Sequence, residues 1–151
     1  MAIAGVVLFA ATCSALVVGV SQVTSHGDAD APAAGNADRF DYCRGGGGPD
    51  CVLDGDTFFM AGERVEIAGI QAPDIHPSRC PEEARRGTEA VQELHRLLNR
   101  GPVTVSAATG WGAADNPSLR KVEVNGIDAA QAMVASGAVR EYWGGPSRGW
   151  C

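Results

Sequence analysis

The chain has 151 residues, enough for one domain with a real core and too few for two. Its 18 acidic and 12 basic side chains give a formal net charge of −6, which argues against a generic nucleic-acid coat protein, because such proteins are basic. The acidity is concentrated in residues 26–42, which hold four acids and one base. The remainder, from residue 43, has fourteen acids and eleven bases, so a local basic face remains compatible with the sequence.

The first 25 residues carry no charged side chain, and their apolar run has about the length that crosses a bilayer as one helix. We predict that residues 1–24 form either a signal peptide, removed on export, or a retained membrane anchor. The absence of a basic n-region and of a small-x-small cleavage site favours the anchor. The chain is therefore expected to be exported and membrane-anchored, on the periplasmic or the extracellular side.

Residues 25–42 are rich in Ala, Asp, Gly and Pro. Such a composition cannot bury a core, so we predict a disordered acidic linker over these residues. No internal repeat is visible in the rest of the chain. We therefore expect a single folded domain over residues 43–151.

Four cysteines follow the leader, at Cys43, Cys51, Cys80 and Cys151. An even number behind an apolar leader is typical of two disulfides in an oxidising compartment. Three pairings are possible. We favour Cys43–Cys51, which closes a short glycine-rich loop and leaves Cys80–Cys151 to tie the C terminus to the first long helix. A zinc site that adds His76 to these cysteines is a weaker alternative, because the spacing matches no common zinc pattern.

The first half of the domain is expected to form strands and then a helix. Residues 51–55 predict a short strand that leads into a turn, and residues 56–70 predict a hairpin that turns at residues 61–62. The clearest helix pattern covers residues 80–101. It has Pro81 at its start, glutamates in its first turn, an apolar stripe and a closing Arg-Gly pair.

The second half repeats the alternation on a smaller scale. Residues 102–107 and 118–126 predict strands, the second ending in an Asn-Gly turn. A short helix is expected between Asp128 as N-cap and Gly137 as the C-terminal stop. Several short strands with one long helix inserted indicate an α+β chain that is mainly β with helices. We predict a small, five-stranded, partly open barrel of the OB-fold type.

Several motifs resemble one known family. "VLDGDT", a hairpin, "IAGIQAPD" and a helix with "EEA" are similar to the staphylococcal-nuclease (thermonuclease) family. "VNGIDAAQAMVASGAVREYW" is similar to that family's strand–turn–helix segment, and the terminal "SRGWC" resembles its exported branch. The resemblance covers roughly residues 40–151. It implies an OB-fold barrel that cleaves DNA or RNA phosphodiesters with one calcium ion.

The resemblance assigns roles to four positions around the metal. Asp56 matches the first metal-binding carboxylate, and Gln71 stands where the second should be. Ala72 would supply only a backbone carbonyl to the ion. Asp74 stands where the family has the glutamate that orients water. Because Gln71 offers an oxygen without charge, the resemblance implies at most a weakened Ca²⁺ site.

Two phosphate-binding arginines are expected from the resemblance, and both are missing at their positions. Glu66 stands at the first and Pro117 at the second. Arg64 lies two residues before Glu66 on the same strand face, and Arg120 and Lys121 follow Pro117 closely. We consider replacement of the lost arginines by Arg64 or Arg120 less favoured than loss of catalysis.

Aromatic side chains are a second group of residues that can bind nucleic acid. Phe58, Phe59 and Trp111 can stack bases on an OB surface, although core packing is the commoner role of a phenylalanine. Trp143 and Trp150 are expected to cover the bottom of the barrel near the Cys80–Cys151 pair.

Three hypotheses about function follow. The first is a calcium-dependent exported nuclease with relocated arginines. The second, which the charge pattern favours, is a catalytically impaired nuclease homologue that binds a partner such as single-stranded nucleic acid. The third is a non-catalytic structural module of the cell envelope. In each case we expect a monomer that contacts a membrane through residues 1–24.

Overall fold

The computed structural model describes residues 33–35, 40–110 and 112–151. The predicted leader and most of the predicted linker lie outside these residues, as does Trp111. The helices are α1 (Pro81–Leu98) and α2 (Ala129–Ala135). The strands are β1 (Ala33–Gly35), β2 (Asp41–Tyr42), β3 (Cys51–Val52), β4 (Thr57–Met60), β5 (Glu63–Ile67), β6 (Ile70–Gln71), β7 (Val103–Ala107), β8 (Leu119–Val124), β9 (Ile127–Asp128) and β10 (Arg140–Glu141).

The predicted turns of the sheet are confirmed. β4 and β5 form a hairpin whose two turn residues, Ala61 and Gly62, have φ of 52° and 81°. Positive φ at both positions gives the twist that matches right-handed strands. Asn125 and Gly126, with φ of 53° and 75°, make the same kind of turn between β8 and β9.

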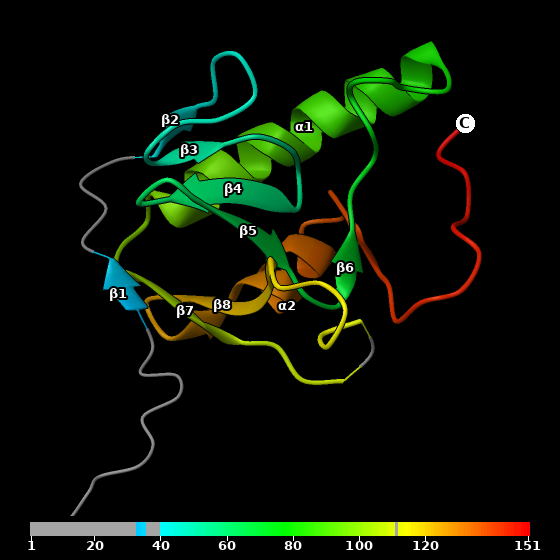
Figure 1. The fold of residues 1–151 in the computed structure, drawn as a ribbon. Coiled ribbons are helices and arrows are strands. Elements are labelled where there is room, and N and C mark those ends of the chain that lie inside the picture. Colours follow the sequence, from blue (N-terminus) through cyan, green and yellow to red (C-terminus); the bar gives the residue numbers. More distant parts are fainter. Residues whose placement is uncertain (1–32, 36–39, 111) are drawn as a thin grey trace, which may run out of the picture.

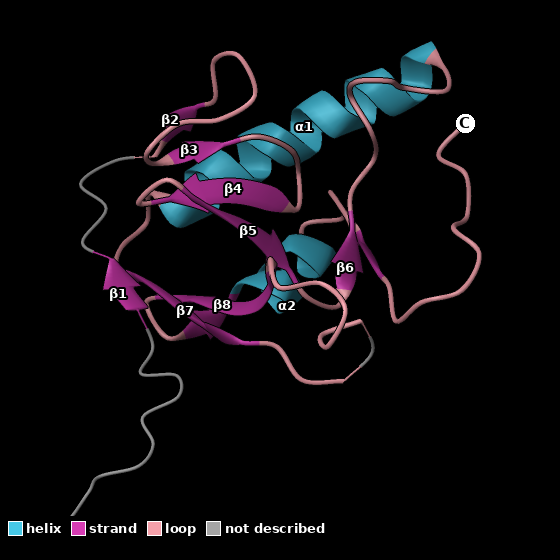
Figure 2. Cartoon of the chain, in the orientation of Figure 1, coloured by secondary structure: helices cyan, strands magenta, loops and turns pink. Residues whose placement is uncertain are grey.

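One strand-rich sheet organises the described residues (Figures 1 and 2). Its strands run in the order β1-β7-β8-β5-β4-β3-β2, with β9 paired to β8. Most pairs are antiparallel, but the short strands β2 and β3 run parallel. The longer strands β5 and β8 also run parallel, with Glu66 beside Leu119 and Ile67 beside Arg120. The connection between these parallel strands contains α1, since parallel neighbours need a long crossover.

The fold is therefore mixed α+β, as predicted, with a large share of strand. The sheet has open ends at β1 and β2, and the described strands do not close it into a barrel. Several short strands were not predicted. β6 and β10 form a separate two-stranded sheet that pairs Gln71 with Arg140. Within the predicted linker, β1 pairs with β7 and β2 pairs with β3.

Both predicted helices are present, α2 with its predicted N-cap and C-terminal stop. α1 has Pro81 in its first turn, as predicted, but it ends at Leu98 with Asn99 as its C-cap, before the predicted Arg-Gly pair. Cys80 precedes α1 and its Sγ accepts a hydrogen bond from the Glu83 amide, while Pro81 occupies the first turn. The Asp128 carboxylate accepts a hydrogen bond from the Gln131 amide at 3.0 Å and caps α2. Gly137 follows α2 with a φ of 77°, which suits the end of a helix.

The core lies between the sheet and the two helices (Figure 2). Its largest fully buried apolar side chains are Phe40, Phe58, Ile67, Leu94, Leu98 and Met133. Phe40 is only 1% exposed, and its ring meets Phe58 edge-on at 5.5 Å. Residues 40–42, which were assigned to the linker, therefore belong to the folded part of the chain.

Two disulfides join the pairs predicted from the sequence, Cys43–Cys51 and Cys80–Cys151. The second brings the C terminus beside the start of α1 (Figure 1). Residues 142–151, the C-terminal segment, are also held by Trp150, whose ring lies 3.6 Å from the guanidinium carbon of Arg140. Within the described residues, no helix is long and apolar enough to cross a membrane.

Candidate functional site

The loop after β3 and the loop after β6 meet at a small polar cavity of about 250 Å³. Its lining contains the predicted site residues Asp56, Arg64, Gln71, Ala72 and Asp74. The sequence analysis assigned these residues to one site although up to 18 positions separate them. The cavity is also lined by Asp54, Glu66 and Tyr142. We call it the acidic cavity.

Asp56 ties the two loops together. One carboxylate oxygen accepts a hydrogen bond from Thr57 Oγ1 at 3.0 Å, and the other accepts one from the Ala72 amide at 2.8 Å. Burial raises the pKa of Asp56, and these two hydrogen bonds counteract part of that rise. The carboxylate is thus occupied in holding the loop around Ala72.

Gly55 lets the acidic turn approach α1. A Cβ at Gly55 would lie 2.4 Å from the Cβ of Ala90 and 2.9 Å from the Cβ of Ala72. Only glycine fits this contact without displacing the helix or the neighbouring loop. The turn between β3 and β4 is therefore positioned by packing, in addition to its local hydrogen bonds from Leu53 and Asp54 to the Thr57 carbonyl.

Gln71 is engaged by the C-terminal segment. Its side-chain oxygen accepts a hydrogen bond from Ser147 Oγ at 2.9 Å, and the Tyr142 amide donates to the Gly69 carbonyl at 2.9 Å. The oxygen that the resemblance assigns to a metal is therefore already bonded within the chain. The sequence offered no signal for Ser147, which is 76 positions from Gln71.

Glu66 faces the loop before β8. Its Oε2 accepts a hydrogen bond from Asn116 Nδ2 at 3.0 Å, and its backbone amide donates to the Ser118 carbonyl at 2.8 Å. Pro117, the other position where the resemblance expects an arginine, is exposed beside Asn116. At these two positions, the chain has a carboxylate–amide pair and a proline in place of two guanidinium groups.

The two candidate replacement arginines differ in placement. Arg64 lines the acidic cavity, whereas Arg120 does not, and the Arg120 guanidinium donates to the Leu119 carbonyl at 3.2 Å. Burial raises the pKa of Asp54, and the charge of Arg64 lowers it in part. Lys121 lies elsewhere, in an ion pair with Glu123 at 2.7 Å. Arg64 is thus the single cation among the described lining residues.

Glu83 was missed by the sequence analysis, although it lies within the "EEA" motif. Its carboxylate is buried and accepts hydrogen bonds from the Arg79 side chain and from the Arg79 amide at 2.6 Å. These hydrogen bonds from Arg79, together with one from the Asp74 backbone, hold the pKa of Glu83 below its usual range. Glu83 therefore anchors the loop that carries Asp74 to the start of α1.

The arrangement does not fit the calcium site that the resemblance implies. Calcium takes six to eight oxygen ligands, several of them carboxylate oxygens. Here Asp56 and Gln71 use their oxygens within the chain, and Asp74 is exposed. Among the described residues, no group of three or more His, Cys, Asp or Glu side chains is placed to hold a metal ion.

The aromatic residues are placed differently from the prediction. Phe58 is fully buried in the core, so it cannot stack a base, and Phe59 is half-buried on the same hairpin. Trp150 is buried beside the C-terminal disulfide, as expected. Trp143 does not cover the core, because it is 68% exposed.

No protein-family model matches this sequence, and no curated protein matches it.

Proposed function

We propose that the folded region is an OB-type barrel of the staphylococcal-nuclease kind whose phosphodiesterase site is degenerate and catalytically impaired. The strand order supports the fold: β3-β4-β5-β8-β7, with one parallel pair and the long helix inserted between its members. An OB fold is a partly open five-stranded barrel, so open sheet ends are compatible with it. Two of the motifs that carry the resemblance, "VLDGDT" and "IAGIQAPD", lie on or beside these strands and line the acidic cavity.

One observation carries the proposed impairment. The hydrogen bond between Glu66 and Asn116 occupies the place where the resemblance requires positive charge. A phosphodiester that enters the acidic cavity meets four carboxylates, those of Asp54, Asp56, Glu66 and Asp74, and one guanidinium. The cavity therefore repels the group that a nuclease must bind.

The expected loss of rate is large. Removing one donor aimed at the charge of a transition state costs about 100- to 1,000-fold in rate. Removing an arginine that stabilises a transferring phosphoryl group costs about 1,000-fold or more. Because both arginine positions are altered, we expect the cleavage rate to be a small fraction of the rate of an intact site of this kind.

A second candidate function rests on Arg64. Its side chain lines the acidic cavity close enough to Asp54 to lower the pKa of that carboxyl. Among the described residues that line the cavity, its guanidinium is the one cationic group that could bind a phosphate beside Asp56. An exported nuclease with a relocated arginine is therefore the alternative, and it requires Arg64 to carry the phosphate alone.

The setting of the protein is part of the proposal. The two disulfides support an oxidising compartment, which is consistent with export. We further propose attachment to a membrane through residues 1–24, weak binding of single-stranded nucleic acid, at most weak binding of Ca²⁺, and a monomeric state.

A cleavage assay tests the proposal. The oxidised 151-residue chain is incubated with single-stranded DNA and RNA, with calcium or with EDTA, beside a Glu66→Arg/Gln71→Asp/Pro117→Arg variant. We expect a silent wild type and a cleaving variant. Glu63→Arg, on the exposed start of β5, is the charge-matched control and should stay silent. Calcium-dependent cleavage by the wild type would contradict impairment. Silence of all three proteins would remove support for the nuclease-type barrel.

A further inference from the structure

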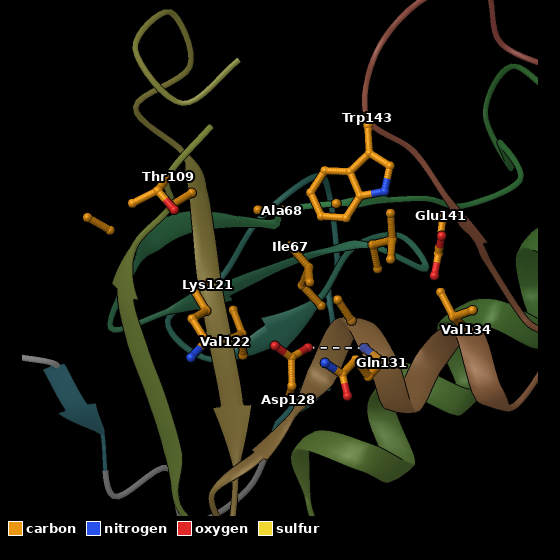
Figure 3. Close-up of a pocket in the computed structure, with 15 residues that line it drawn as sticks. Ile67, Ala68, Thr109, Lys121, Val122, Asp128, Gln131, Val134, Glu141 and Trp143 are labelled. Atoms are coloured by element: carbon orange, nitrogen blue, oxygen red, sulfur yellow. Dashed lines mark hydrogen bonds between the residues drawn. The ribbon is translucent and has the colours of Figure 1, made fainter. Parts of the chain in front are cut away.

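A second cavity, of about 380 Å³, lies between the start of α2 and the strands β5 and β8 (Figure 3). It is separate from the acidic cavity, with which it shares only Ile70. Its volume lies within the usual range of small-molecule sites. Neither the resemblance nor the proposed function uses it.

Part of the cavity lining is apolar. The accessible apolar part comes from Val134 of α2, Trp143 and small alanine and glycine residues, while Ile67 and Val122 lie beneath it and are almost fully buried. Figure 3 shows Trp143 on one side of the cavity, opposite Gln131 of α2 and Asp128, the residue that caps this helix. The cavity therefore offers an apolar floor below an aromatic ring.

Trp143 is held in an exposed position. Its indole lies against Gly69, where a Cβ would come within 2.9 Å of the ring, and the φ of Gly69 is +83°. The lack of a side chain at Gly69 lets the ring lie on the backbone. A ring that stays 68% exposed above an apolar cavity is typical of a binding surface rather than of core packing.

The charge at the cavity is negative. Asp128, Glu141 and Lys121 line it, and Lys121 is already paired with Glu123. Glu141 makes no ion pair with any described residue. Glu141 ends β10 and stands two positions before Trp143, and both residues line the cavity (Figure 3). A carboxylate without an ion-pair partner among the described residues and an exposed indole therefore share one cavity.

From this geometry we propose that the cavity binds a small alkylated ammonium ion, with Trp143 and Glu141 as its recognition pair. An indole face attracts cations, and quaternary ammonium groups are recognised in this way. Alkylation matters because a primary ammonium brings three N–H donors, for which the lining offers few acceptors besides the carboxylates of Asp128 and Glu141. An alkylated cation has few or no donors to satisfy and packs its carbon atoms against Val134, the alanine side chains and the ring of Trp143.

The test is an NMR titration of the oxidised 151-residue chain with choline, followed at the Trp143 Nε1–H signal. The matched probe is 3,3-dimethylbutan-1-ol, which has the shape of choline without its charge. We expect choline to saturate the site with a Kd of about 0.1–10 mM, as suits so small a ligand. The neutral alcohol should bind at least about tenfold more weakly, because it lacks the attraction of the ring and the carboxylate.

Variants separate this site from the neighbouring surface. Trp143→Leu, followed at backbone amides of the cavity, should weaken choline binding by about 3- to 30-fold. Glu141→Gln should also weaken it, while Lys121→Gln should strengthen it by removing a like charge. Asp115→Asn is the matched control for Glu141→Gln, because Asp115 lines a different cavity on which Trp143 also borders. That control should leave the Kd unchanged.

Several results would overturn the proposal. The first is the absence of a saturable shift with choline up to about 50 mM. The second is equal binding of choline and of the neutral alcohol. The third is loss of choline binding in Asp115→Asn but not in Glu141→Gln. Vesicles of phosphatidylcholine offer the same cation as a lipid headgroup. Binding to such vesicles without binding of free choline would also overturn the proposal, because contact with the lipid surface would then explain the interaction. Cleavage of nucleic acid is not measured, so the outcome is independent of the proposed function.

Discussion

Asn116 Nδ2 donates a hydrogen bond to Glu66 Oε2 at 3.0 Å, although the two residues are 50 positions apart. The bond joins β5 to the loop that leads into β8, its parallel neighbour. Glu66 is thereby satisfied as a carboxylate within the chain. The hydrogen bond satisfies the Glu66 carboxylate without a bound phosphate or metal ion. This is consistent with the proposed loss of the two phosphate-binding arginines.

Reversing the charge at Glu66 should improve the binding of nucleic acid. We expect Glu66→Arg to tighten binding of a single-stranded oligonucleotide by about tenfold at low salt, because a carboxylate that repels phosphate becomes a donor to it. Glu63→Arg makes the same change of charge at the exposed start of β5 and should have a much smaller effect. Fluorescence anisotropy measures both affinities. Equal gains in the two variants would indicate a general effect of net charge instead of a site.

The stability of the protein should depend on pH through Asp56. Burial raises its pKa in the folded state above the ordinary value of 3.8. Between these two values the folded state binds more protons than the unfolded state, so this group makes the free energy of unfolding fall as pH rises through that window. Asp56→Asn removes the titration and keeps an oxygen for the Ala72 amide.

We therefore expect Asp56→Asn to be more stable than the wild type at neutral pH. The difference should shrink as pH falls through the raised pKa of Asp56 towards 3.8. Urea denaturation at a series of pH values measures the difference. A variant that is less stable than the wild type at pH 7 would show that the charged Asp56 stabilises the fold, contrary to this expectation.

Gly55 should tolerate no side chain. Gly55→Ala places a methyl group 2.4 Å from the Cβ of Ala90, and we expect it to lower the free energy of unfolding by about 1–3 kcal/mol through overpacking. Gly149→Ala meets no atom within 4 Å and should change stability by less than about 0.5 kcal/mol. The double variant Gly55→Ala/Ala90→Gly should recover part of the loss. No recovery would mean that the contact with α1 is not the cause.

Arg140 should control the order of the C-terminal segment. Its guanidinium lies over the ring of Trp150 and donates to the Gly149 carbonyl at 3.1 Å. Arg140→Lys loses the flat stacking group and the fixed fork of donors. We expect the Tyr142 amide, which donates to Gly69, to exchange with solvent about 3- to 30-fold faster.

Arg148→Lys is the matched control for hydrogen exchange, because the Arg148 side chain makes no hydrogen bond or ion pair with a described residue. Its exchange rates should equal those of the wild type. Unchanged exchange in Arg140→Lys would mean that the other contacts of the segment, such as the Cys80–Cys151 disulfide and the hydrogen bond from Ser147 to Gln71, order it without Arg140.

Local features of the fold were predictable because their causes are local. The turn at Ala61 and Gly62, the cap at Asp128 and the start of α1 at Pro81 depend on residues within a few positions of each other. The short loop between Cys43 and Cys51 likewise favoured a disulfide between these two residues. That pairing left Cys80 and Cys151 to form the second disulfide. Five of the candidate site residues line one cavity because they lie on a single hairpin and the loops beside it, whereas Arg120 lies outside that cavity.

Contacts between distant segments could not be predicted from these patterns. The bond from Ser147 to Gln71 and the bond from Asn116 to Glu66 depend on how the whole chain packs. The exposure of Trp143 has the same origin, because it follows from the approach of the ring to Gly69. Polar and aromatic residues in loops do not recur at the regular spacing that marks a helix or a strand, so the sequence does not reveal their distant partners.

The most direct test of impaired catalysis is a single-turnover cleavage experiment with the wild-type protein in excess over a labelled single-stranded oligonucleotide. The reaction is followed with calcium and with EDTA, beside an Arg64→Ala variant. We predict the same negligible rate in all three reactions. A calcium-dependent rate in the wild type that Arg64→Ala abolishes would contradict impairment and assign the phosphate to Arg64.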